Sequence, residues 1–94
     1  MNLYVTDQAA RAMRDLINRR VMGKAALIES HPDGGLKIDV LFSVEQNDAI
    51  MINVVPPIFT TLHTLRQLRD SSIDFDHAEG GFVIRLDNVV HPSA

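Results

Sequence analysis

The stretch IDFDHAEGGFVIRL, residues 73–86, is the most informative part of the chain because it predicts a β-hairpin. Apolar residues alternate with other residues on either side of the adjacent Gly80 and Gly81. A period of two is typical of strands, and a glycine pair between two such runs is typical of a hairpin turn. We therefore expect two strands that meet at this turn. The apolar positions are Ile73, Phe75, Phe82, Ile84 and Leu86.

A helix is predicted over residues 7–21, after a short strand over residues 2–5. Thr6 can accept a hydrogen bond from a free backbone N–H, and Asp7 is well placed beside the positive end of the helix dipole. Gly23 is expected to end the helix. The apolar stripe at helical spacing consists of Ala9, Met13, Leu16, Ile17 and Val21.

A second helix is predicted over residues 57–69, directly after a strand that Pro56 and Pro57 terminate. Its apolar residues recur every third position, so we expect most of this face to pack into the core. The alternative is that part of the face contacts a partner protein. The stripe consists of Phe59, Leu62, Leu65 and Leu68.

Three further strands are predicted between the two helices. Residues 24–29 form a short apolar run, and residues 36–45 show the most regular alternation in the chain, with one buried face. Residues 49–55 are apolar on both faces, as expected of a central strand or of one covered on both sides. Turn-forming residues separate the strands at 31–35 and 46–48. Strands linked as hairpins with helices between them predict an α+β domain, with a mostly antiparallel or mixed sheet and two helices.

Composition limits the function classes. With 46% hydrophobic residues, the 94 residues predict a single small domain over residues 1–94. The net charge of -3 argues against nucleic-acid binding, and the longest apolar run, residues 49–55, is too short to cross a membrane. Residues 1–7 do not resemble a signal peptide, so we expect a cytoplasmic protein. A domain this small often gains stability by association, so we expect a homo-oligomer or a contact with another protein.

Basic residues gather in and after the first predicted helix. We interpret them as a solvated helix face and a last turn in which cations suit the helix dipole. The alternative is a patch that binds an anion or an acidic partner. The residues are Arg11, Arg14, Arg19, Arg20 and Lys24.

The order of elements, together with five short motifs, resembles the HesB-like or A-type family of iron–sulfur cluster carriers. The segment VTDQAA, residues 5–10, resembles the family's entry into its first helix. The resemblance implies the small α+β fold of these carriers and action through dimers and protein contacts. The other matching motifs are Gly34 with Gly35, the segment IDF at 73–75, Gly81 with Phe82, and Asn88.

The cluster ligands of that family are missing. Its first cysteine would fall at or beside Leu36 and its Cys-Gly-Cys motif near or beyond residues 91–94, yet the 94 residues contain no cysteine. The glycine that the family has before its Ile-Asp-Tyr motif is also missing, and Asp70 stands nearby. Iron–sulfur clusters need soft thiolate donors. We therefore expect no cluster and no other cofactor.

Asp74, Asp76 and His77 offer an alternative site for a single divalent metal ion. Alternate residues of a strand point to the same side, so the two carboxylates could meet one cation, with the histidine added at the turn. The favoured interpretation is the wet face of an edge strand that enters a polar turn, because the spacing matches no defined metal loop. His31, His63 and His91 are scattered, and we interpret them as surface or turn residues.

No arrangement in the chain predicts an enzyme. No Gly-x-Ser-x-Gly motif surrounds a serine, and the two glycine pairs are too short to hold a phosphate. The leading hypothesis is a cysteine-less homologue of the iron–sulfur carriers that acts as an accessory or protein-interaction module. The alternatives are a mononuclear metal-binding protein and an unrelated structural or regulatory subunit.

Overall fold

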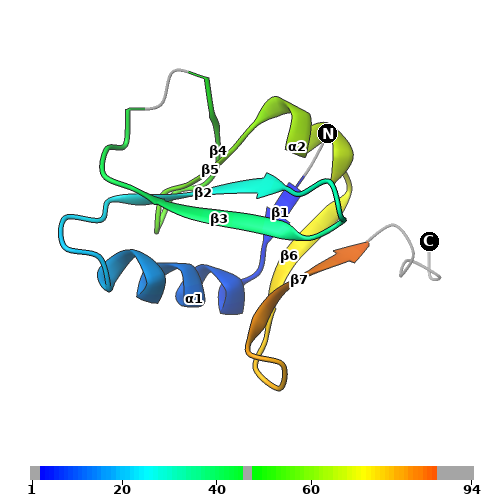
Figure 1. The fold of residues 1–94 in the computed structure, drawn as a ribbon, viewed down its shortest axis with the longest axis horizontal. Helices are drawn as coiled ribbons and strands as arrows, with labels where there is room; N and C mark the ends of the chain where they lie inside the picture. The colour runs from blue at the N-terminus through cyan, green and yellow to red at the C-terminus, as the bar shows by residue number, and fades with distance from the viewer. Residues whose placement is uncertain (1–2, 46–47, 87–94) are drawn as a thin grey trace.

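The computed structural model describes residues 3–45 and 48–86, which form two β-sheets and two helices (Figure 1). The predicted strand start at Asn2, the predicted turn at residues 46–47, the family motif at Asn88 and the predicted surface residue His91 lie outside these residues. Neither helix within this part of the chain is long and apolar enough to cross a membrane. The elements are β1 (Leu3–Val5), α1 (Asp7–Asn18), β2 (Ala25–Ser30), β3 (Leu36–Leu41), β4 (Ile50–Asn53), β5 (Ile58–Thr60), α2 (Leu62–Gln67), β6 (Ser71–Asp76) and β7 (Gly81–Leu86).

Both sheets are mixed. The smaller sheet has the order β1-β6-β7, with β1 parallel to β6, and the larger has the order β3-β2-β5-β4, with β2 parallel to β5. The predicted hairpin of β6 and β7 is present, but its turn consists of residues 77–80, because Gly81 is the first residue of β7 and pairs with Asp76. The α+β class, the mixed sheets and the two helices confirm the predicted fold class.

Helix α1 packs against both sheets and supplies much of the core. Thr6 caps it as predicted, with the Ala9 N–H donating to Thr6 Oγ1 at 3.2 Å. The residues of its stripe at Ala9, Met13 and Ile17 are buried. Figure 1 shows α1 running alongside β2 and β3, with the β6–β7 hairpin beside its N-terminal end. The buried cluster consists of Leu3, Ala9, Met13, Ile17, Ala26, Ile28, Ile58 and Ile73.

Helix α1 ends at Asn18, earlier than the predicted residue 21. Val21 is 89% exposed, because the chain has already turned away from the helix axis and Met22 adopts a positive φ of 67°. Gly23 then passes so close to the end of the helix that an added Cβ would overlap the Ile17 carbonyl oxygen. The sequence predicts that Gly23 ends the helix, whereas in the structure the helix has already ended and Gly23 allows this close approach.

The prediction of a single helix over residues 57–69 is wrong in its first part. Residues 58–60 form β5, which lies beside β2 in the larger sheet, and the helix begins only at Leu62. Thr60 Oγ1 donates to the Ile28 carbonyl at 2.8 Å, and Thr61 caps α2 by accepting from the Thr64 N–H. The three-residue spacing therefore combines a buried strand residue, Phe59, with helix residues, of which Leu62 is exposed.

The strands on either side of the 46–48 turn are shorter and less buried than predicted. Because β5 occupies the place beside β2, β4 is an edge strand rather than a central one. It ends at Asn53, whose side chain donates to the Pro56 carbonyl at 2.9 Å and so helps to close the turn into β5. Strand β3 ends at Leu41. The residues that follow these strands, predicted to be buried, are exposed: Phe42, Val44, Val54 and Val55.

Candidate functional site

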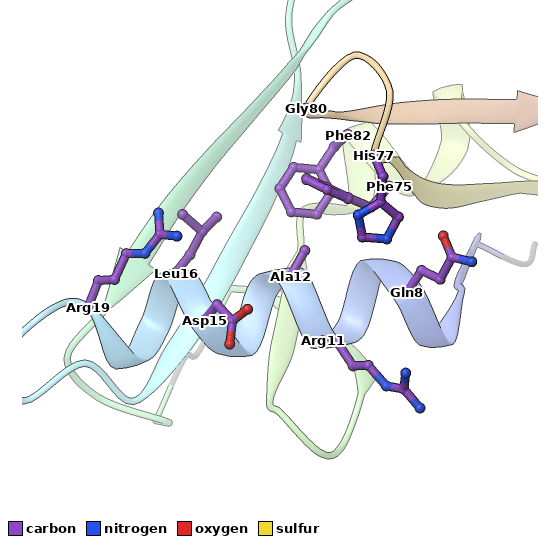
Figure 2. A pocket seen from close by; sticks show the side chains of 10 residues that line it. All are labelled: Gln8, Arg11, Ala12, Asp15, Leu16, Arg19, Phe75, His77, Gly80 and Phe82. Carbon is purple, nitrogen blue, oxygen red and sulfur yellow. The ribbon is translucent and has the colours of Figure 1, made fainter.

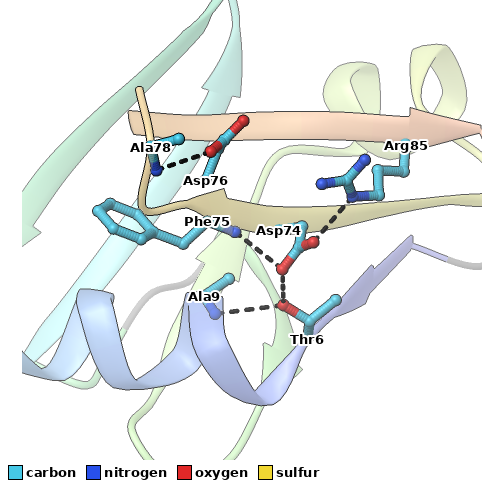
Figure 3. A network of polar contacts seen from close by, with 7 residues as sticks. All are labelled: Thr6, Ala9, Asp74, Phe75, Asp76, Ala78 and Arg85. Atoms are coloured by element: carbon cyan, nitrogen blue, oxygen red, sulfur yellow. Dashed lines mark hydrogen bonds and ion pairs between the residues drawn. The ribbon is translucent and has the colours of Figure 1, made fainter. Parts of the chain in front are cut away.

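A polar network centred on Asp74 joins the start of α1 to the hairpin (Figure 3). Asp74 Oδ1 accepts from Thr6 Oγ1 at 2.6 Å and from the Phe75 N–H at 2.9 Å. Asp74 Oδ2 accepts from Arg85 Nε at 2.8 Å, across the two strands of the hairpin. The Thr6 hydroxyl oxygen accepts from the Ala9 N–H at the same time. One threonine therefore both caps the helix and ties it to β6.

These donors hold Asp74 in its ionised form. The hydrogen bond from Thr6, followed by those from Arg85 and the Phe75 backbone, lowers the pKa of Asp74 from 3.8 to about 2. The same contact with Asp74 raises the pKa of Arg85. Both carboxylate oxygens of Asp74 accept hydrogen bonds from the protein. This aspartate therefore links the start of α1 to the two strands of the hairpin.

Asp76 and His77 have other surroundings. Asp76 Oδ1 accepts from the Ala78 N–H at 2.9 Å and the Glu79 N–H at 3.3 Å, which stabilises the hairpin turn. The exposed His77 ring makes an edge contact with Phe75, with ring centroids 5.0 Å apart. Across residues 3–45 and 48–86, no three histidine, aspartate or glutamate side chains are placed to hold a metal ion. The geometry gives the metal site at Asp74, Asp76 and His77 no support, and it stays a prediction.

The remaining histidines lie on separate elements. His31 is exposed in the turn between β2 and β3, where its Nδ1 lies 3.0 Å from Asp33 Oδ1. The hydrogen bond from the Gly35 backbone and the neighbouring His31 lower the pKa of Asp33. His63 is exposed on α2. Leu36, at or beside which the resemblance puts the family's first cysteine, is the half-buried first residue of β3 and packs against the core.

A groove of about 570 Å³ runs between α1 and the hairpin (Figure 2). Its apolar part includes Phe75 and Phe82, which contact each other edge to face with centroids 5.0 Å apart. Sequence reasoning missed this groove. The only sequence feature that pointed to a binding surface here was the group of basic residues in and after the first helix. The sequence around these residues does not show that the hairpin lies beside them. The lining residues are Gln8, Arg11, Ala12, Asp15, Leu16, Arg19, Phe75, His77, Gly80 and Phe82.

A second surface lies at one end of the larger sheet, and we call it the apolar end. The Lys24 N–H donates to the Leu41 carbonyl, and the Ala26 N–H donates to the Pro57 carbonyl. These bonds bring together the turn before β2, the chain after β3 and the turn between β4 and β5, all at the left of Figure 1. The apolar side chains exposed there, at 50% to 89%, are Val21, Met22, Phe42, Val44, Val54 and Val55.

Two mixed sheets and two helices in this order make the small α+β domain that the resemblance to HesB-like carriers predicts. A solved structure confirms that fold: SufA of Escherichia coli, a protein involved in the biosynthesis of iron–sulfur clusters. The match has a TM-score of 0.72 and covers 90% of this chain and 83% of that chain, at 15% sequence identity. No protein-family model and no curated protein matches the chain.

The Asp74 network predicts a stability that depends on pH. A carboxylate whose pKa is lower in the folded state than in the unfolded chain stabilises the fold above the unfolded value, and this contribution is lost as the pH falls toward the folded value. We expect Asp74→Asn to lower the free energy of unfolding by about 1 to 2 kcal/mol at about pH 6, and by much less at about pH 2.5. Urea unfolding at the two pH values measures this.

The control for this experiment is Asp39→Asn, which removes an exposed carboxylate of β3. Asp39 lies 3.7 Å from Lys37 Nζ, in an exposed pair of the kind that contributes little. An Asp74→Asn effect that is no larger than the control, or one that is equal at both pH values, would contradict the role assigned to Asp74.

Metal content tests the alternative site. Because the Asp74 carboxylate is engaged by Thr6, Phe75 and Arg85, we expect elemental analysis of gently purified protein to find no stoichiometric divalent metal. A metal bound at one ion per chain, and lost in Asp76→Ala, would instead establish the site.

Proposed function

We propose that the protein is an interaction module with the fold of SufA that self-associates and does not carry an iron–sulfur cluster. The observation that carries the proposal is the apolar end, six exposed apolar side chains in a domain whose 94 residues offer no thiolate ligand. Iron in such clusters is held mainly by cysteine thiolates, and Rieske clusters, in which two histidines replace two cysteines, still keep two thiolates. No catalytic step is part of the proposal.

The size of the apolar end supports an interface. Contiguous exposed apolar patches larger than a few hundred Å² usually mark contact sites. Six side chains at this degree of exposure offer on the order of several hundred Å², which approaches the roughly 800 Å² that each partner buries in a standard stable interface. These side chains lie in the connection from α1 to β2 and in connections between strands of the larger sheet, and backbone hydrogen bonds hold these connections together.

The charges around the apolar end favour a second copy of the same chain as the partner. Arg20 and Lys24 lie on the turn before β2, and Glu45 and Asp48 lie within the connection between β3 and β4. None of these four side chains forms an ion pair with another residue in the described ranges. In a two-fold symmetric dimer the same patch meets itself, so the basic turn of one copy can face the acidic connection of the other.

The match in fold to SufA favours this hypothesis over an unrelated structural subunit. The match covers 90% of the chain at a TM-score of 0.72. The metal-binding alternative is not favoured by any contact in the described residues.

Sedimentation velocity over a range of concentrations tests the proposal. We expect a monomer–dimer equilibrium with a dissociation constant on the order of 1 to 10 µM, and a shift of at least tenfold toward monomer when Phe42 and Val54 are both replaced by serine. The matched control is Leu62→Ser, which removes a leucine 44% exposed on α2, outside the apolar end. We expect this control to dimerise normally.

A charge swap adds a more specific test. Lys24→Glu should weaken the dimer by repulsion, and the double variant Lys24→Glu with Glu45→Lys should recover most of the loss. A protein that stays monomeric up to about 0.1 mM, or a dimer unaffected by the Phe42 and Val54 substitutions, would contradict the proposal.

A further inference from the structure

The groove between α1 and the hairpin has an aromatic, apolar wall and a rim whose net charge is positive. Figure 2 shows Phe75, Phe82 and His77 gathered over Ala12, with Arg19 toward one end of the helix and Gln8 toward the other. The volume of about 570 Å³ lies within the roughly 300 to 1,000 Å³ that is typical of small-molecule sites. Apolar walls with a few polar groups at the rim are also typical of such sites.

The charge of the rim is positive, opposite to that of the whole chain. Its charged groups are the guanidinium groups of Arg11 and Arg19 and the carboxylate of Asp15, whereas the chain has a formal net charge of -3. Neither guanidinium has an ion-pair or hydrogen-bond partner among residues 3–45 and 48–86. A cation without a protein partner beside an apolar wall is suited to a ligand that has an apolar body and an anionic end.

The two arginines are not equivalent. Arg11 lies on α1 and Arg19 is its C-cap residue, eight positions later, which separates them by about 12 Å along the helix axis. In Figure 2 the Arg19 side chain lies on the same side of the helix as Leu16 and the hairpin, and the Arg11 side chain extends away from the hairpin. A single anionic group beside the aromatic wall therefore meets Arg19, while Arg11 adds only to the positive potential.

The aromatic wall indicates the shape of the ligand. The rings of Phe75 and Phe82 are tilted by 72° and those of Phe75 and His77 by 74°, so the edge-to-face arrangement offers ring faces and edges to a further planar group. Gly80 lines the groove at a positive φ of 70°, and a Cβ added there would meet nothing within 4 Å. The absence of a side chain at this turn keeps one border of the groove open.

We propose that this groove binds a small planar aromatic carboxylate, with its ring against Phe75, Phe82 and Leu16 and its carboxylate at Arg19. At the other end Gln8 and His77 offer hydrogen bonds to a polar ring substituent. The aromatic wall belongs to the β6–β7 hairpin, which takes no part in the apolar end, and Arg19 is the groove residue nearest to that end in the sequence, two residues before Val21.

Titration of the full chain with 2-naphthoate, followed by backbone amide NMR shifts, tests the proposal. We expect saturable shifts in residues of the hairpin and of the facing side of α1, with a dissociation constant on the order of 0.1 to 1 mM. The uncharged 2-naphthamide has the same ring system and should bind about fivefold more weakly, because it lacks the ionic contact.

Three arginine variants, two on α1 and one at its C-cap, make the test specific. Arg19→Gln should weaken naphthoate binding about fivefold and abolish the preference for the acid over the amide. Arg11→Gln should have a smaller effect, and Arg14→Gln, which replaces an exposed arginine of α1 outside the groove, should have none. Phe82→Leu should weaken both ligands equally, with the amide shifts of the free protein reporting that the fold is retained.

The Phe42 and Val54 double variant should bind naphthoate as the unaltered chain does, which separates a failure of this proposal from a failure of the dimer. Shifts confined to the apolar end, equal effects of Arg14→Gln and Arg19→Gln, or no saturable shift at the hairpin would overturn it. Tighter binding of an acidic, phenylalanine-containing peptide with shifts that extend beyond the groove would assign the surface to a protein partner and also overturn it.

Discussion

The hydrogen bond from Thr6 to Asp74 fixes the start of α1 against the smaller sheet. It joins residues that are 68 positions apart and links the helix cap to the middle of β6 at a distance of 2.6 Å. The Thr6 N–H also donates to the Ile73 carbonyl, so backbone and side chain hold the junction together. With the first turn of α1 fixed to the hairpin, the stripe at Ala9 and Met13 faces the core and the opposite border of the helix is left to form the groove.

The parts of the fold that could be predicted from the sequence are those with local signals. The alternation and glycine pair of residues 73–86 predict the hairpin, and Thr6 with the stripe after it predicts the start of α1. Strand β5 could not be found in this way, because Phe59 fits the helical spacing of Leu62 and Leu65 as well as it fits a strand. Its conformation is settled by pairing with Leu27 of β2, more than thirty residues away. Once β5 is inserted, β4 moves to the edge.

The apolar end and the groove could not be predicted from the sequence for the same reason. Residues such as Val21 and Phe42 are apolar, and their spacing continues a buried stripe, so the pattern predicts burial. The structure exposes them because the helix and strand that carry the pattern end before they are reached. The groove likewise needs a helix and a hairpin whose residues are some sixty positions apart in the chain. Sequence patterns indicate which face of an element is apolar, but not where the element ends or what lies beside it.

The packing that holds this fold together does not depend on the residues that would bind an iron–sulfur cluster. Packing of Ala9, Met13, Ile28 and Ile73 requires no thiolate, and Leu36, at or beside which the resemblance puts the family's first cysteine, packs against the core. The direct test is anaerobic incubation of the chain with ferrous iron, sulfide and a reductant, followed by gel filtration, iron analysis and absorption spectroscopy. The account predicts that the eluted protein carries no iron–sulfur chromophore. A stable chromophore with stoichiometric iron and sulfide, ligated through imidazole or carboxylate groups, would contradict it.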